Sequence, residues 1–197
     1  MKIVGIGLNK TGTSSLGVCM KTWGLRQFWF SPEAFDLWRE KNIEGLLSMA
    51  ERFDSFEDWP WPLVYREFDQ RYPGSKFILT RRMSADAWFA SLCKHAARTG
   101  PTRFREAIYG YAMPDGHKEE HIRFYQNHLL AVRSYFANRP GDLLEVCWEE
   151  GDGWQKLSSY LGLPDPGIPF PHAEKSPPKS SGLMERMRRA WWAARAR

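Results

Sequence analysis

With 197 residues, the chain is long enough to bury one hydrophobic core and too short for two large domains, so we expect a single domain. Its net charge of +5 at pH 7 suits anionic ligands, but basic and aromatic residues do not interleave as in a base-stacking groove, and no nucleic acid partner is expected. Three widely spaced cysteines argue against a disulfide framework or a zinc site. No apolar run approaches the ~20 residues of a membrane span, or resembles a signal peptide, so we expect a cytoplasmic protein.

The first predicted element is a short buried strand at residues 3–8, which leads into a turn rich in Gly, Lys, Thr and Ser. Gly7 and Gly12 allow the backbone to curl so that successive N–H groups point at one anion. A helix pattern begins at Ser14 and continues over residues 16–23, and its positive N-terminal end faces the same anion. This segment therefore predicts a phosphate-binding loop.

The spacing of the two glycines matches the outer frame of the ATP- and GTP-binding phosphate loop, which requires Lys directly after the second glycine. Thr13 occupies that position, and the lysine lies in the middle of the loop at Lys10. Metal-dependent phosphoryl transfer also needs a carboxylate after a second strand to hold magnesium. The strand predicted at residues 76–80 runs instead into Arg81 and Arg82, so the sequence favours an anion site without a metal.

Between the loop and this second strand, the pattern is mostly helical. Ser31 as N-cap and Pro32 in the first turn begin a helix that is predicted to reach residue 52. A loop rich in Asp, Glu, Trp and Pro follows at residues 53–62, and then a helix at residues 63–71. The remaining predicted elements are a helix from Ser84 to about residue 98, a mobile stretch at residues 99–116, a helix at residues 118–138 and a strand at residues 143–148.

Strands separated by helices of this length predict an α/β fold with a mainly parallel central sheet and helices on both faces, the three-layer α/β/α arrangement of P-loop proteins. Ligands are expected at the carboxyl ends of its strands. The domain is predicted to cover residues 1–175, followed at residues 176–197 by a Pro- and Lys-rich tail and a basic helix. That helix has the composition to contact an anionic membrane surface, although docking on the domain or fraying is the simpler interpretation.

Residues 10–16, Lys-Thr-Gly-Thr-Ser-Ser-Leu, resemble the K-x-G-T-x-S loop of the sulfotransferases that use 3′-phosphoadenosine 5′-phosphosulfate (PAPS). Further stretches resemble the same family in order: residues 72–80 with Arg82, residues 88–92 with Ser91, and residues 153–171. The last of these is similar to the tail motifs of the bacterial and protist branch. The resemblance spans residues 1 to about 175.

The resemblance implies that PAPS is the sulfuryl donor, that adenosine 3′,5′-bisphosphate is the product, and that no metal is demanded. Lys10 and the loop N–H groups would then stabilise the charge that grows on the bridging oxygen. Arg82 and Ser91 would bind the 3′-phosphate, with Arg81 as the alternative to Arg82. The residues that the resemblance assigns to nucleotide binding are Asn9, Lys10, Thr11, Gly12, Thr13, Ser14, Ser15, Arg82 and Ser91.

Transfer to the acceptor also needs a general base. Relatives in the family place a His or a carboxylate before the helix that leads into the second strand, and the acidic residues 54–60 fill that place here. Asp58, directly before a Trp-Pro pair, is the first choice of base, with Asp54 and Glu57 as alternatives. His95, on the helix after the second strand, is a further candidate.

The sequence leaves the acceptor open. Ser15 stands where the branch that acts on phenols and steroids has Trp, so adenine stacking must come from elsewhere and small phenols are less favoured. We expect a hydroxyl or amine on a small molecule, a sugar or a lipid. Two other functions remain as alternatives: a P-loop nucleotide kinase or NTPase, and a non-catalytic nucleotide-binding protein of the same fold.

Overall fold

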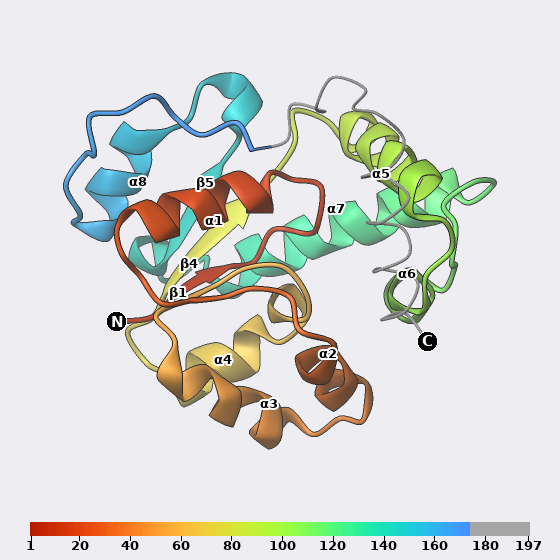
Figure 1. Ribbon diagram of the computed structural model, residues 1–197, viewed down its shortest axis with the longest axis horizontal. Helices are drawn as coiled ribbons and strands as arrows, with labels where there is room; N and C mark the ends of the chain where they lie inside the picture. The colour runs from red at the N-terminus through yellow and green to blue at the C-terminus, as the bar shows by residue number, and fades with distance from the viewer. Residues whose placement is uncertain (174–197) are drawn as a thin grey trace, which may run out of the picture.

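The computed structural model describes residues 1–173, so the tail predicted at residues 176–197 lies outside the described part of the chain. Within residues 1–173 the chain forms a sheet of five strands, all parallel, in the order β2-β3-β1-β4-β5 (Figure 1). The strands are β1 (Ile3–Gly5), β2 (Gln27–Phe28), β3 (Ser55–Phe56), β4 (Lys76–Thr80) and β5 (Leu143–Val146). The predicted α/β fold with a parallel central sheet is confirmed.

Helices cover both faces of this sheet. The α-helices are α1 (Thr13–Thr22), α2 (Pro32–Arg39), α3 (Ile43–Met49), α4 (Tyr65–Arg71), α5 (Ala85–Thr99), α6 (Arg103–Tyr109), α7 (Lys118–Tyr135) and α8 (Trp154–Leu161). α1 and α8 lie on one face, where their apolar side chains share a buried cluster with Ile78. α4 and α7 lie on the other, where theirs surround Phe77. Figure 1 shows α1 and α8 together on one side of the strands, with α3 and α4 on the opposite side.

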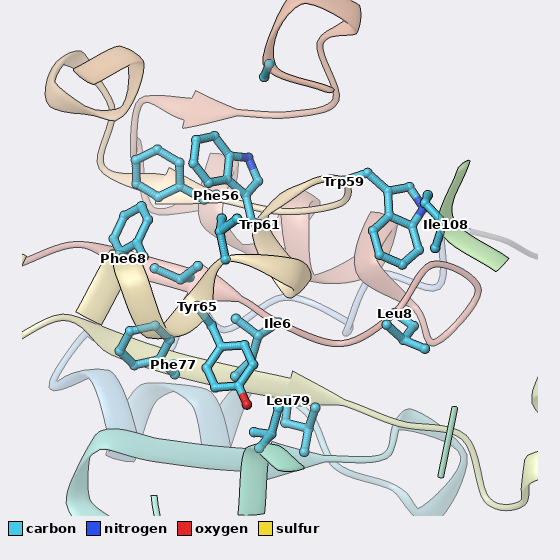
Figure 2. Packing of buried hydrophobic residues seen from close by; sticks show 14 of the residues in the cluster. Ile6, Leu8, Phe56, Trp59, Trp61, Tyr65, Phe68, Phe77, Leu79 and Ile108 are labelled. Atoms are coloured by element: carbon cyan, nitrogen blue, oxygen red, sulfur yellow. The ribbon is translucent and has the colours of Figure 1, made fainter. Parts of the chain in front are cut away.

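The central strands are apolar because both of their faces are covered. In β4, Phe77 faces the larger cluster and its neighbour Ile78 faces the smaller one. Figure 2 shows part of the larger cluster, in which the rings of Phe56, Trp61 and Phe68 lie beside one another. The Phe56 ring lies 4.9 Å from the ring of Trp61 and 4.9 Å from that of Phe68, both in edge-to-face contact. This packing fixes the strand ends that carry the site.

Two predicted helix starts and one predicted strand are confirmed. Ser31 and Ser84 are the N-caps of α2 and α5, and each serine Oγ accepts a hydrogen bond from the backbone N–H three residues later, at 3.4 Å and 3.1 Å respectively. The predicted strand at residues 76–80 is β4. No helix within residues 1–173 has both the length and the apolar composition to cross a membrane.

The single helix predicted from Ser31 to residue 52 is wrong. The chain leaves the helical conformation after Arg39, because Lys41 adopts a left-handed backbone with a φ of 60°. Asn42 then caps a new helix, α3, by accepting the Gly45 N–H at 3.0 Å. A 3-10 turn, η1 (Ala50–Arg52), ends this segment.

Two predicted loops also hold regular structure. The stretch at residues 53–62 contains β3, which pairs with β1 and β2. The stretch at residues 99–116, expected to be mobile, contains α6. Arg105 fastens it, since its guanidinium donates to Thr99 Oγ1 at 3.0 Å, to the Ala112 carbonyl at 2.9 Å and to the carbonyl of Gly100. A side chain with three such partners holds its segment in place.

Because the strands are parallel, their carboxyl ends share one edge of the sheet. Four of the segments that leave this edge are residues 6–12 after β1, residues 57–60 after β3, residues 81–84 after β4 and residues 147–150 after β5. Most of the predicted site residues lie on these four segments.

Candidate active site

The N-terminal loop (residues 8–12) is held in one conformation by hydrogen bonds. Lys10 and Gly12 have left-handed backbones, with φ of 68° and 95°. The Thr11 hydroxyl donates to the Leu8 carbonyl at 2.6 Å, so Thr80 at the end of β4 must be the donor in its 2.6 Å bond to Thr11. The loop is therefore tied to the adjacent strand end before any ligand arrives.

Three aromatic side chains brace the same loop. Trp88 on α5 donates its indole N–H to the Asn9 carbonyl at 2.9 Å, and the Tyr109 hydroxyl donates to Asn9 Oδ1 at 2.7 Å. Trp148 donates its indole N–H to the Gly12 carbonyl at 3.1 Å. A Cβ at Gly12 would collide with the Trp148 ring, so this position requires glycine for space as well as for its φ.

The N-terminus of α1 lacks the side-chain cap that α2 and α5 have. Its N-cap is Gly12, which offers no side-chain acceptor, and its first turn contains no acidic residue. The N–H groups of a helix's first turn are therefore suited to bind an anion. Thr13 and Ser15 are buried here and Ser14 is half-buried. The Ser15 oxygen accepts the N–H of Ala173 at 3.1 Å, so part of its hydrogen-bonding capacity is used by the chain itself.

The two arginines after β4 have different surroundings. Arg82 Nη1 donates to the Lys10 carbonyl at 3.3 Å, which joins it to the N-terminal loop. Arg81 forms ion pairs with Glu145 at 2.7 Å and with Glu150 at 2.6 Å. The structure therefore brings Arg82, and not Arg81, to the loop.

Ser91 and His95 both lie on α5, where they are half-buried. Ser91 is three residues beyond Trp88, and residues three apart are neighbours on a helix surface. Trp88 contacts the loop at Asn9, and from its spacing we expect Ser91 to lie on the neighbouring part of the same helix surface.

The carboxylate candidates separate into two groups along β3. Asp54 precedes the strand and lies at the opposite edge of the sheet from the N-terminal loop. Its two oxygens accept from Arg26 Nε and Nη2 at 2.8 Å each, and these bonds lower the pKa of Asp54 to about 2. The parallel sheet therefore places Asp54 at the far edge, away from the N-terminal loop.

Asp58 follows β3 and lies on the loop side of the sheet. Its φ of 69° is left-handed, and its Oδ1 accepts the N–H of Trp59 at 2.9 Å. Burial raises the pKa of Tyr109, and the charge of Asp58 raises it further. The ring of Trp59, the residue after Asp58, lies 6.0 Å from the ring of Tyr109. Since Tyr109 bonds Asn9, Asp58 is on the same side of the site as Lys10.

Glu57 is next to Asp58 in sequence but is enclosed, with 1% of its surface exposed. Its Oε2 accepts from Gln27 Nε2 at 2.8 Å, and a Cβ on Gly5 would lie 3.3 Å from its Cγ. Burial raises the pKa of Glu57 to about 8. At neutral pH this side chain holds a proton, whereas a general base must first be ionised.

We expect the free energy of unfolding of the wild-type protein to fall between pH 5 and pH 8 relative to that of a Glu57→Gln variant. The pKa of Glu57 rises from its ordinary value of 4.5 to about 8 on folding, so between these values the unfolded chain binds fewer protons. Stability then decreases with pH, by at most about 1.4 kcal/mol per unit. Urea unfolding at several pH values measures the difference, and parallel curves for the two proteins would contradict it.

Sequence reasoning missed the residues that brace the loop. Trp88 reads as an ordinary core residue, and it is fully buried, yet its N–H holds Asn9. Tyr109 falls in the stretch expected to be mobile. The sequence shows only that Trp88 and Tyr109 each carry a hydrogen-bond donor. It does not show which group accepts from either of them.

Comparison with known proteins agrees with this geometry. A family model described as a sulfotransferase domain matches residues 2–177. Ava biosynthesis cluster protein M of Aspergillus versicolor is 27% identical over 213 residues, which cover 87% of this chain and 80% of that protein. The crystal structure of a sulfotransferase from Alicyclobacillus acidocaldarius has the same fold, with a TM-score of 0.56 at 20% identity over 99% of this chain and 93% of that one. Since the family model covers most of its length, the chain belongs to the sulfotransferase family.

Proposed function

We propose that this sulfotransferase moves a sulfuryl group from PAPS to a hydroxyl or amine acceptor. The observation that carries the proposal is the junction between the N-terminal loop and Arg82. The loop and the N-terminus of α1 form one cationic end, and the Arg82 guanidinium bonded to the Lys10 carbonyl forms a second. A nucleotide with phosphates at both its 5′ and 3′ positions requires two such ends.

The residues present fit PAPS as the sulfuryl donor. Arg82 Nε is buried and, among the described residues, has no hydrogen-bond partner. A buried N–H without a hydrogen-bond partner lowers the stability of the fold by about 1–3 kcal/mol, and a bond to an anionic oxygen would offset this cost. The 3′-phosphate is the group we assign to Arg82 and Ser91, and the 5′ end is assigned to residues 9–15.

The proposed roles follow from the chemistry of each side chain. When bound, PAPS supplies the sulfuryl group and leaves as adenosine 3′,5′-bisphosphate. Lys10 neutralises the charge that develops at the bridging oxygen, and Thr13 and Ser14 orient the 5′ end. The Asp58 carboxylate accepts the proton that the acceptor's hydroxyl or amine gives up.

We assign the acceptor side to the aromatic side chains near Asp58. Trp59 follows Asp58 in the chain, and its ring centroid lies 6.0 Å from that of Tyr109. Such side chains suit the apolar body of a small molecule, the face of a sugar or a lipid.

All three cysteines are free thiols, which supports the proposed cytoplasmic location.

Ligand-induced stabilisation tests the proposed donor. Adenosine 3′,5′-bisphosphate is expected to raise the melting temperature more than 5′-AMP or ATP does, because affinity for the native state adds directly to stability. Arg82→Ala should remove this preference. Arg81→Ala is the matched control, since its side chain pairs with Glu145 and Glu150 instead, and it should keep the preference. A larger shift with ATP would favour the kinase alternative.

A further inference from the structure

The carboxylate of Glu149 contacts the proposed 3′-phosphate residue directly. It lies on the 3-10 turn η4 (Trp148–Glu150), which follows β5. Glu149 Oε1 accepts from Arg82 Nη2, and Glu149 Oε2 accepts the backbone N–H of Met83 at 2.8 Å. Both oxygens are therefore engaged with the segment that follows β4.

The turn that carries Glu149 is itself fastened to the N-terminal loop. The Trp148 indole N–H donates to the Gly12 carbonyl at 3.1 Å, and the ring covers Gly12 so closely that a Cβ would not fit. Arg82 is joined to the same loop through the Lys10 carbonyl. Glu149, Arg82 and the loop therefore form one connected unit.

We propose that Glu149 is a positioning residue, which holds the Arg82 guanidinium ready for the 3′-phosphate of the nucleotide. The inference rests on the proposed function. A long arginine side chain loses rotamer freedom when it binds a ligand, and a partner that fixes it beforehand removes this cost from binding. Arg82 Nη2 donates to Glu149 and Nη1 donates to the Lys10 carbonyl, while Arg82 Nε has no partner among the described residues.

The carboxylate has a second, opposing effect, because its negative charge repels a nearby phosphate. The hydrogen bond from the Met83 N–H to Glu149 Oε2 favours the positioning role, because a backbone group holds the carboxylate in place. The bond from Arg82 lowers the pKa of Glu149, so the side chain stays ionised at neutral pH. The two effects predict opposite results when the charge is removed, and a substitution therefore distinguishes them.

Titration calorimetry with adenosine 3′,5′-bisphosphate and with 5′-AMP tests the proposal on the full chain. The relevant quantity is the ratio of the two dissociation constants, which isolates the 3′-phosphate. Glu149→Gln is nearly isosteric, and Glu149→Ala removes both bonds. Each is expected to lower the preference for the bisphosphate about tenfold, by analogy with the loss of a residue that orients a metal ligand, with 5′-AMP affinity unchanged.

Glu150→Gln is the matched control, because Glu150 lies on the same turn and pairs with Arg81. It should keep the wild-type ratio. Adding Glu149→Gln to Arg82→Ala should cause no further loss, since Glu149 acts through Arg82. Thermal unfolding verifies that each variant is folded.

An unchanged or increased ratio in Glu149→Gln overturns the positioning role, and an increase identifies the carboxylate as a competitor of the phosphate. Equal affinity of the wild-type protein for the two nucleotides is a different result. It overturns the proposed function itself before any variant is compared.

Discussion

Lys10→Ala is expected to lower the rate of sulfuryl transfer about 100-fold or more while weakening the binding of adenosine 3′,5′-bisphosphate much less. The lysine neutralises charge that appears only as the bridging oxygen leaves, so its contribution is greater in the transition state than in the bound nucleotide. Its left-handed backbone and the bonds around it hold the loop in place without the side chain. Turnover at saturating PAPS and calorimetry with the bisphosphate measure the two effects.

Lys21→Ala is the control for the loss of a positive charge. Lys21 is an exposed residue in the last turn of α1, away from the N-terminal loop. Its replacement should leave turnover unchanged. A Lys10→Ala variant that keeps its turnover at saturating PAPS but binds the nucleotide more weakly would mean that the lysine only binds the nucleotide.

Asp58→Asn should reduce transfer by about 10²- to 10⁴-fold and leave nucleotide binding intact. The amide keeps the shape of the side chain and its bond from the Trp59 N–H, but it does not accept a proton from the acceptor. Product formation and bisphosphate affinity, measured on the same preparation, separate the two steps.

Asp54→Asn is the matched control, because Asp54 pairs with Arg26 at the other edge of the sheet. Activity should persist in that variant. Full activity in Asp58→Asn would exclude this aspartate as the base, and His95 on α5 would be the next residue to replace.

The parts of the fold that the sequence predicts correctly are those with strong local signals. β4 combines a run of apolar residues with a following arginine pair, and α5 has Ser84 as a cap, so both appear in the structure where the sequence places them. In the N-terminal loop, Gly12 has the left-handed backbone that its glycine allows, whereas the left-handed backbone of Lys10 has no such signal in the sequence.

The parts that the sequence does not predict depend on distant partners. β2 and β3 are two residues long, and their pairing depends on strands that are distant in the sequence: β3 pairs with β1, and β2 pairs with β3. The bonds from Tyr109 to Asn9 and from Glu149 to Arg82 join residues that are far apart in the chain. No local pattern encodes such pairs, so they are visible only in the folded protein.

The central position of β1 has a consequence for how this chain is made. This strand is made before both of its partners: β3 follows only after α1, β2, α2 and α3, and β4 comes later still. At about 5–20 residues per second, the apolar strand waits for roughly 3–10 s without a neighbour. During this time it presents an unpaired edge to other nascent chains. A chaperone that covers this strand until β3 has been made should therefore increase the yield of native protein, whereas slower synthesis should lengthen the exposure.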